Sequence, residues 1–211
     1  LMVSLSKRLN AVASLVKSGS SVADVGTDHG YIPVYLVKNN ISPFAVAMDI
    51  NEKPLASCKS LVKDEGLESV IDTRISNGLE KLNKGECDTV IIAGMGAELI
   101  VDILSSCDFV KELHLILQPM THPEIARKYL YDNGFEINND IIVADGKHSY
   151  SVFDANYTGK IVTKTLKDYF LGNITDFSNK EYFLHLLNYL NNKSKSGADL
   201  SDVISAVEEI L

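Results

Sequence analysis

The chain has 211 residues, enough for one full domain and a small appendage, and its 45% hydrophobic and 23% charged residues are typical of globular proteins. A formal net charge of -8 argues against indiscriminate nucleic-acid binding but does not exclude a local basic patch. No apolar run approaches the about 20 residues of a membrane span, and no signal-peptide pattern precedes the first helix, so we expect a cytoplasmic protein that does not enter a membrane.

The first predicted element is a helix over residues 4–18, where apolar side chains recur at helical spacing. Ser4 or Ser6 can cap its start, and Gly19 ends it. Basic residues are interspersed along this helix, and they could form either a phosphate-binding face or simply a solvated face. These basic residues are Lys7, Arg8 and Lys17.

A glycine-rich turn follows the first predicted strand, Val22–Val25, breaks it at Gly26 and leads into a helix that begins near Gly30. This order of strand, turn and helix is typical of the first unit of a doubly wound α/β domain, whose ligand lies at the carboxyl end of the strand. The turn contains Asp24 and Asp28, and it has neither a G-x-G-x-x-G pattern nor a phosphate-binding lysine. Such a turn suits a ligand with positive charge, and S-adenosylmethionine carries both an ammonium and a sulfonium group.

Strand and helix patterns alternate up to residue 134, which predicts a parallel sheet. After the first strand, the predicted strands cover residues 44–49, 70–75, 88–93 and 113–117. One helix between them carries an apolar face formed by Leu99, Ile100, Ile103 and Leu104. Residues 135–143 and 150–157 predict an antiparallel pair, so we expect a Rossmann-like α/β fold with a seven-stranded mixed sheet.

Beyond residue 159, two apolar stripes at helical spacing replace this alternation. One stripe runs from Tyr182 to Leu190 and the other from Leu200 to Ile210, with a polar turn over residues 191–197. They predict a helical hairpin whose stripes bury one another and which also rests on the first domain. We therefore divide the chain into an α/β domain, residues 1–159, and a C-terminal helical, coiled-coil-like domain, residues 160–211.

Side chains suited to binding follow three further predicted strands. Asp49, at the tip of the second strand, can accept both hydroxyls of a ribose. Asn77 can pair with an adenine edge through its amide, although Asn77-Gly78 is also a common turn. Residues 93–96, Ala-Gly-Met-Gly, end the fourth strand, where they could admit a ligand to the backbone or simply allow close helix packing.

Asp28-His29 is the sharpest candidate pair, since it lies in the glycine-rich turn. His29 could orient a substrate, although a hydrogen-bonded loop histidine is the simpler interpretation. His114, within a strand, and His185, at the edge of a helical stripe, favour structural roles. No Ser-His-Asp arrangement or metal cluster is indicated. The cysteines are widely spaced and predict neither a zinc site nor a disulfide; they are Cys58, Cys87 and Cys107.

Three motifs together resemble the bacterial tRNA (adenine-22-N1)-methyltransferase family: Asp24-Val-Gly-Thr-Asp-His-Gly-Tyr-Ile-Pro33, Ala93-Gly-Met-Gly96 and Leu117-Gln-Pro119. The resemblance covers residues 5–157, and the helical hairpin fits it as well. It implies a class I methyltransferase domain that uses S-adenosylmethionine, a C-terminal coiled-coil-like domain, and methylation of adenine N1 in the D-arm region of tRNA. Two positions depart from the family pattern: Ala97 replaces a second glycine, and Ser151 replaces an acid.

The resemblance also implies roles for residues at the predicted strand tips. The residues implied around the methionine end of S-adenosylmethionine are Asp24, Gly26, Asp28 and Gly30. Those implied at the ribose and the adenine are Asp49, Ile50, Asn77 and Gly78. Those implied beside the transferred methyl group are Ala93, Gly94 and Met95.

N1 of adenine has an in-plane lone pair, so it can attack a methyl group without first losing a proton. The main task of the enzyme is then to position the base, for which we single out Asp28, His29 and Gln118, with Tyr31 as a stacking surface. The resemblance makes tRNA the partner, with the basic residues of the first helix as phosphate contacts. We expect a monomer that needs no metal ion.

Other functions stay open at this point. A methyltransferase acting on a small molecule or a protein would suit the acidic composition. A non-catalytic S-adenosylmethionine-binding module would keep the cofactor site without transferring a methyl group. An NAD-dependent dehydrogenase is disfavoured because Asp24 and Asp28 crowd the position that the phosphates would need.

Overall fold

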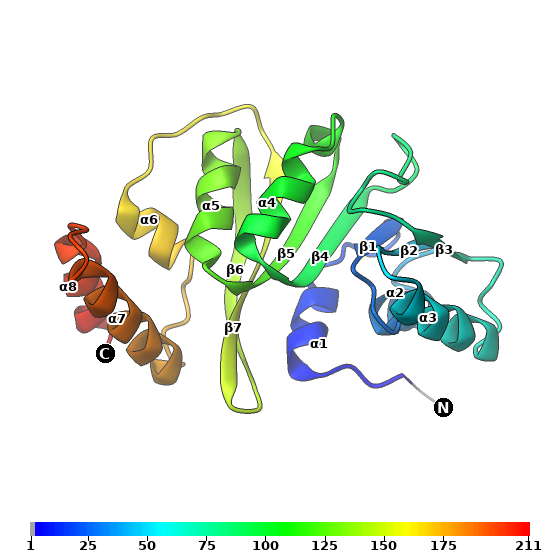
Figure 1. Cartoon of the computed structure of the whole chain (residues 1–211), viewed down its shortest axis with the longest axis horizontal. Helices are drawn as coiled ribbons and strands as arrows, with labels where there is room; N and C mark the ends of the chain where they lie inside the picture. Colours follow the sequence, from blue (N-terminus) through cyan, green and yellow to red (C-terminus); the bar gives the residue numbers. More distant parts are fainter. Residues whose placement is uncertain (1–2) are drawn as a thin grey trace.

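β1 (Val22–Val25) lies inside the sheet in the computed structural model, which describes residues 3–211. The sheet has seven strands in the order β3-β2-β1-β4-β5-β7-β6 (Figure 1). The first five pair in parallel, whereas β7 is antiparallel to both β5 and β6. The predicted Rossmann-like, seven-stranded mixed sheet is therefore confirmed. The strands after β1 are β2 (Ala45–Asp49), β3 (Ile71–Ile75), β4 (Thr89–Gly96), β5 (His114–Thr121), β6 (Phe135–Asp145) and β7 (His148–Tyr157).

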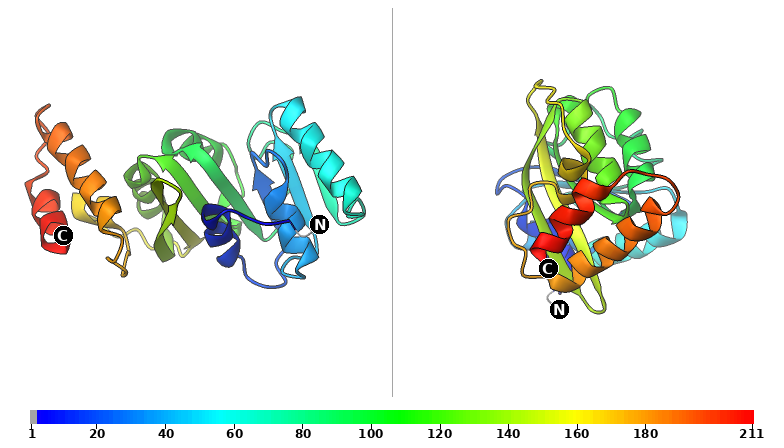
Figure 2. Two further views of the ribbon diagram at one scale, coloured as in Figure 1. Left: turned by 90° about the horizontal axis from the view of Figure 1, so that it is seen from below. Right: turned by 90° about the vertical axis from the view of Figure 1, so that its left-hand side faces the viewer.

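Helices cover both faces of this sheet (Figure 2). Because side chains alternate along a strand, Ile91 of β4 packs in one buried cluster with Leu36, and its neighbour Ile92 packs in the opposite cluster with Leu130. The strands at the centre are buried on both sides, which explains their continuous apolar runs. One layer contains α1 (Lys7–Ser14), α2 (Tyr31–Lys38) and α3 (Glu52–Asp64), and the other contains α4 (Ala97–Ser105) and α5 (Pro123–Asp132). A short 3-10 helix, η1 (Val110–Glu112), precedes β5.

The first helix is shorter than predicted. α1 begins at Lys7, where the Ser6 hydroxyl accepts the backbone N–H of Leu9 and caps the helix. It ends at Ser14, and residues 15–18 form turns instead of a further helical turn. Ser6 is thus the cap of the two serines that the sequence offers.

β4 and β5 run beyond their predicted ends, to Gly96 and Thr121. They remain paired there through an irregular register around Met95, which breaks the simple alternation that marks a strand in sequence. Leu99 also differs from the prediction: it is 50% exposed, because the buried face of α4 is formed by its neighbours Ile100, Ile103 and Leu104.

Three helices lie together at one end of the molecule (Figure 2). They are α6 (Leu166–Leu171), α7 (Lys180–Ser194) and α8 (Ser201–Ile210). α7 and α8 pack against each other, and their buried side chains share one cluster with those of α6. Sequence periodicity does not predict α6, whose start is stabilised by a capping box between Thr165 and Asp168. Within residues 3–211, no helix combines the length and the apolar character needed to cross a bilayer.

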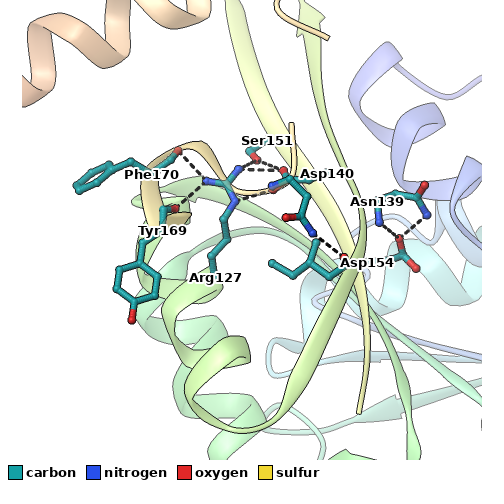
Figure 3. Close-up of polar contacts among 9 residues, drawn as sticks. Arg127, Asn139, Asp140, Ser151, Asp154, Tyr169 and Phe170 are labelled. Carbon is teal, nitrogen blue, oxygen red and sulfur yellow. Dashed lines mark hydrogen bonds and ion pairs between the residues drawn. The ribbon is translucent and has the colours of Figure 1, made fainter. Parts of the chain in front are cut away.

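A buried ion pair joins these C-terminal helices to the sheet (Figure 3). Arg127 of α5 is fully buried and donates two hydrogen bonds to Asp140 of β6, from Nε to Oδ2 at 2.8 Å and from Nη2 to Oδ1 at 2.9 Å. Its Nη2 also donates to the Ser151 hydroxyl at 2.6 Å. On the other side, Nη1 donates to the backbone carbonyls of Tyr169 and Phe170 in α6 at 3.2 and 3.1 Å. Two elements of the sheet and two helices therefore meet at one guanidinium group.

The chain can reach this guanidinium only because residue 172 is a glycine. Gly172 has a φ of +58°, and a Cβ placed on it would lie 2.0 Å from Oδ2 of Asp140. The next residue, Asn173, donates its backbone N–H to the same carboxylate oxygen at 3.1 Å. The two residues that follow α6 therefore contact the Arg127–Asp140 ion pair directly.

Arg127→Met should lower the free energy of unfolding by about 3–5 kcal/mol, because it leaves the buried Asp140 carboxylate without its cation. Chemical denaturation measures this loss. Lys128→Met is the matched control, because Lys128 pairs with Asp132 at the surface and should change stability by at most about 1 kcal/mol. Equal losses in the two variants would contradict the role assigned to the buried pair.

Candidate functional site

The carboxyl ends of β1, β2 and β4 meet where the strand order reverses, since β1 pairs with β2 on one side and with β4 on the other. The glycine-rich turn is fixed to β2 by two backbone hydrogen bonds, from Gly26 and Thr27 to the carbonyl of Met48 at 2.8 and 2.9 Å. At the tip of β2, Asp49 accepts the backbone N–H of Asp28 at 3.4 Å and that of Asn51 at 2.8 Å. The structure therefore brings the first and second predicted strand tips together.

Asp24 and Asp49 form a pair of buried acids at this point. Asp24 is 3% exposed and Asp49 is 8% exposed. Burial, with a smaller contribution from the Asp49 carboxylate, raises the pKa of Asp24 to about 6. Within the described residues, neither acid forms an ion pair with a lysine, arginine or histidine. A ligand with positive charge at this position would lower the cost of burying the ionised Asp24 carboxylate and would offset its repulsion from the Asp49 carboxylate.

The glycine-rich turn after β1 also contacts the tip of β4. Gly26 has a φ of +72°, and a Cβ placed on it would lie 2.3 Å from the terminal methyl carbon of Met95. Met95 from the tip of β4 therefore lies directly over the turn. Gly30 caps the start of α2 and packs closely against the thiol of Cys58. Burial, followed by the charge of Asp24, raises the pKa of that thiol to about 12, so it stays neutral.

Three exposed side chains form the rim of the turn. Asp28 has a φ of +51°, and its carboxyl lies 3.8 Å from Nε2 of His29. The His29 ring stacks on the Tyr31 ring with centroids 5.4 Å apart and planes 27° from parallel. The predicted base-positioning residues Asp28, His29 and Tyr31 are thus neighbours, and all three face solvent.

Gln118, the fourth of those residues, is instead buried between the tips of β4 and β5. Its Oε1 accepts Nη1 of Arg8 at 2.5 Å and the backbone N–H of Gly94 at 3.0 Å, and its Nε2 donates to the carbonyl of Pro119 at 3.0 Å. The guanidinium of Arg8 also lies over the Tyr150 ring, 5.7 Å from its centroid. Arg8 is therefore engaged at the strand tips, and it contributes little to a solvated helix face.

The other two basic residues predicted on the first helix have different surroundings, and Lys17 lies beyond the end of α1 at Ser14. Lys7 is exposed, and Lys17 reaches Asn156 of β7 with an exposed hydrogen bond of 3.4 Å. The three basic residues do not form one patch around Arg8. Tyr150 is a site residue that sequence reasoning missed, and no local signal connects it with a helix that lies far earlier in the chain.

The tips of β2 and β3 present apolar and polar groups. Ile50 is 60% exposed and Ile75 is 45% exposed, so two apolar side chains face solvent beside Asp49. Asn77 donates its amide to Glu80 within its own turn at 2.8 Å, and Gly78 packs against Ile103 of α4. Ile75 was not predicted as a site residue, although an apolar residue just before a polar turn is a usable signal of an exposed binding surface. Ala93 lies on β4 beside Gly94, and Ala97 is buried at the start of α4.

The two histidines for which the sequence favours structural roles, His114 and His185, lie away from the glycine-rich turn. His114 is buried in β5, with Nε2 2.6 Å from the carboxylate of Asp154 and Nδ1 3.3 Å from the hydroxyl of Thr89. His185 is exposed on α7, with Nε2 3.8 Å from Glu181. Over residues 3–211, no group of three or more His, Cys, Asp or Glu side chains is arranged to hold a metal ion.

These residues fit S-adenosylmethionine better than a dinucleotide. The buried acids Asp24 and Asp49 favour a cationic group, and two phosphates would meet like charge there. Asp49 can accept from ribose hydroxyls, and exposed Ile50 and Ile75 offer apolar surface to a flat base.

Comparisons with known proteins agree with this chemistry. The family described as "Methyltransferase domain" matches residues 5–153. A Bacillus subtilis tRNA (adenine(22)-N(1))-methyltransferase is 38% identical over 164 residues, which are 74% of this chain and 69% of the relative. The crystal structure of the B. subtilis m1A22 tRNA methyltransferase TrmK superposes with a TM-score of 0.86 at 29% identity, covering 99% of both chains. Streptococcus pneumoniae Sp1610 in complex with S-adenosyl-L-methionine superposes with a TM-score of 0.89 at 29% identity, covering 99% of this chain and 100% of that one.

The raised pKa of Asp24 should make the stability of the ligand-free protein depend on pH. Between 3.8 and about 6, the folded protein keeps a proton that the unfolded chain releases, so the free energy of unfolding falls as the pH rises through this window. The total fall attributable to Asp24 is about 3 kcal/mol. In chemical denaturation at about pH 4 and about pH 7, Asp24→Asn should lack this fall.

Asp28→Asn is the control for that experiment, because its carboxyl is in the same turn but 71% exposed. It should follow the wild-type pH dependence. Parallel stability profiles for the wild type and Asp24→Asn would show that the buried carboxyl carries no such penalty.

Proposed function

The chain belongs to the tRNA (adenine(22)-N1)-methyltransferase family, and on this premise we propose that methyl transfer takes place at the carboxyl ends of β1, β2 and β4. It is an S-adenosylmethionine-dependent enzyme that methylates N1 of adenine 22 in tRNA. The observation that carries the location of the site is the pair of buried acids, Asp24 and Asp49, which have no cation partner in the described chain.

We propose the cofactor contacts that the family resemblance implies, and the position of these residues at or beside the strand tips supports them. The residues proposed for the methionine end are Asp24, Gly26, Asp28 and Gly30. Those proposed for the ribose and the adenine are Asp49, Ile50, Asn77 and Gly78. Those proposed beside the transferred methyl group are Ala93, Gly94 and Met95. The backbone N–H of Asp28 in the turn donates to the Asp49 carboxylate, and Met95 contacts Gly26. These two contacts support one continuous site.

The protein's part in the reaction is to position its substrate. When bound, S-adenosylmethionine supplies an electrophilic methyl group carried by a sulfonium. N1 of adenine presents a lone pair, so no side chain has to act as a general base. Holding the base in line with the methyl group can lower the barrier by about 7–11 kcal/mol in favourable cases. The exposed residues Asp28, His29 and Tyr31 are proposed to hold the base, and the Asp28 carboxylate would offset the charge that develops on the ring.

Gln118 is proposed as a positioning residue. Its buried amide joins Arg8 to the backbone of Gly94, so it fixes the tip of β4 where the methyl group is transferred. Arg8 acts through Gln118 in this proposal. Lys7 and Lys17, which are both exposed, remain the proposed phosphate contacts for tRNA.

We further propose a division into two domains and a monomeric enzyme. Residues 1–159 would form the methyltransferase domain, and residues 160–211 the helical, coiled-coil-like domain. The separate buried cluster of α6, α7 and α8 supports this boundary. The Arg127 network crosses it, so the C-terminal domain should depend on the first for its stability.

The decisive assay is methyl transfer to purified tRNA, followed by digestion and mass spectrometry of the nucleosides. We expect N1-methyladenosine from the wild type, and Asp49→Ala should weaken S-adenosylmethionine binding about tenfold or more in calorimetry, because a charge-assisted contact is lost. A control, Asp64→Ala at the end of α3, should leave binding unchanged. A different methylated nucleoside would reject the substrate, and unchanged affinity in Asp49→Ala would reject the cofactor contact.

Arg8→Met and Lys7→Met test positioning against phosphate binding on neighbouring residues. Arg8→Met should lower kcat by about 10- to 100-fold, because Gln118 loses its donor and the β4 tip loosens. Lys7→Met should leave kcat unchanged, weaken tRNA binding and reduce the salt dependence of that binding by about one counterion. The opposite pattern, in which Arg8→Met changes tRNA affinity alone, would make Arg8 a phosphate contact.

A further inference from the structure

A cavity of about 510 Å³ lies between the end of β5, the start of β7 and the face of α7 that packs toward the sheet. Pro119 and Met120 line it immediately after Gln118 in the chain. Tyr150 also lines it, and the same ring lies against the Arg8 guanidinium. The cavity therefore adjoins the proposed methyl-transfer site and is separated from it by the contacts between Arg8, Gln118 and Gly94.

The walls of this cavity are rich in flat rings and poor in net charge. Tyr189 packs against His122 with ring centroids 5.5 Å apart and against Phe170 at 6.3 Å. The carboxylate of Glu124 accepts the Tyr189 hydroxyl at 3.1 Å and lies 3.4 Å from Nδ1 of His122, so its charge is engaged within the wall. No lysine or arginine is among the described lining residues. Lys193 adjoins the wall, where its Nζ donates to the Tyr189 hydroxyl at 2.9 Å and lies 3.9 Å from the Glu124 carboxylate, so its charge is engaged by these two side chains.

Polar groups are available at the mouth of the cavity. His148 and His185 line it from β7 and α7, and both are exposed. Their ring nitrogens can donate or accept hydrogen bonds. Aromatic faces inside and hydrogen-bonding groups at the entrance are the combination by which proteins hold single, unstacked bases.

We infer that this cavity is a second base-binding subsite, which takes an unpaired nucleobase of the tRNA next to the target adenine. The inference rests on the proposed function, because only a tRNA in the methyl-transfer site brings such a base within reach. A base held here anchors the strand beside the target and so helps to keep the adenine exposed. The subsite recognises the base by stacking and edge contacts, and the phosphates stay outside.

Leu186→Trp tests the subsite by filling it, because Leu186 lines the cavity from α7. It should lower kcat/KM for tRNA by about tenfold or more. Leu184→Trp is the matched control: the same change is made on the same helix, at a side chain that is 51% exposed and does not line the cavity, and kcat/KM should stay unchanged. Calorimetry should give equal S-adenosylmethionine affinities for the wild type and both variants.

A second comparison uses tRNAs in which the nucleotide just before or just after the target adenine lacks its base. For the wild type, one of these abasic tRNAs should show a fall in kcat/KM of about tenfold, and for Leu186→Trp the same tRNA should match the intact one. His185→Ala, an exposed change at the rim, serves if Leu186→Trp does not fold, and should shrink the abasic effect.

The outcomes separate this inference from the proposed function. Failure of the wild type to methylate intact tRNA would refute the function itself. Wild-type kcat/KM in a folded Leu186→Trp, or equal losses from the abasic change in the wild type and the cavity variants, would overturn the subsite while leaving the function intact.

Discussion

A carboxylate taken out of water needs a positive partner or a proton, and residues 3–211 supply no cation to Asp24. The reversal of strand order at β1 and β4 puts this acid beside Asp49, and the second charge makes the first harder to ionise. The strand tips are thus less stable alone than an apolar junction would be. At the proposed site, binding of a cationic methyl donor would remove that penalty, so the affinity for the ligand and the lower stability of the free strand tips would have one cause.

Another buried charge, the Arg127 guanidinium, has its partners within the protein. Arg127 meets Asp140 in a two-point ion pair and uses its remaining donors on Ser151 and on the carbonyls of α6. The Ser151 hydroxyl completes the contacts of the guanidinium without adding a second negative charge. The Arg127 charge is thus satisfied inside the protein and holds the C-terminal helices, whereas Asp24 has no cation partner among the described residues.

A series of side-chain contacts near the end of β5 lies between the Asp24 site and the Arg127 ion pair. The first helix is joined to the tip of β4 through Arg8, Gln118 and Gly94. The Arg8 guanidinium also contacts the ring of Tyr150, which lines the cavity beneath α7. The C-terminal helices therefore do more than cover an edge of the sheet, because α7 forms one wall of a cavity beside the proposed methyl-transfer site. Their attachment through Arg127 keeps that wall in place.

The sequence by itself determined the order of strands and helices, the mixed sheet, and the acids and glycines of the strand tips. These features depend on neighbouring residues: apolar runs, helical spacing, and turns that need glycine, as at Gly26. Only the tertiary structure decided that Arg8 lies at the tips of β4 and β5, that Gln118 is buried, that β4 and β5 continue through an irregular register, and that a cavity lies under α7. Arg8 and Gln118 are 110 positions apart, and no local pattern records which distant side chains the packed sheet will bring together.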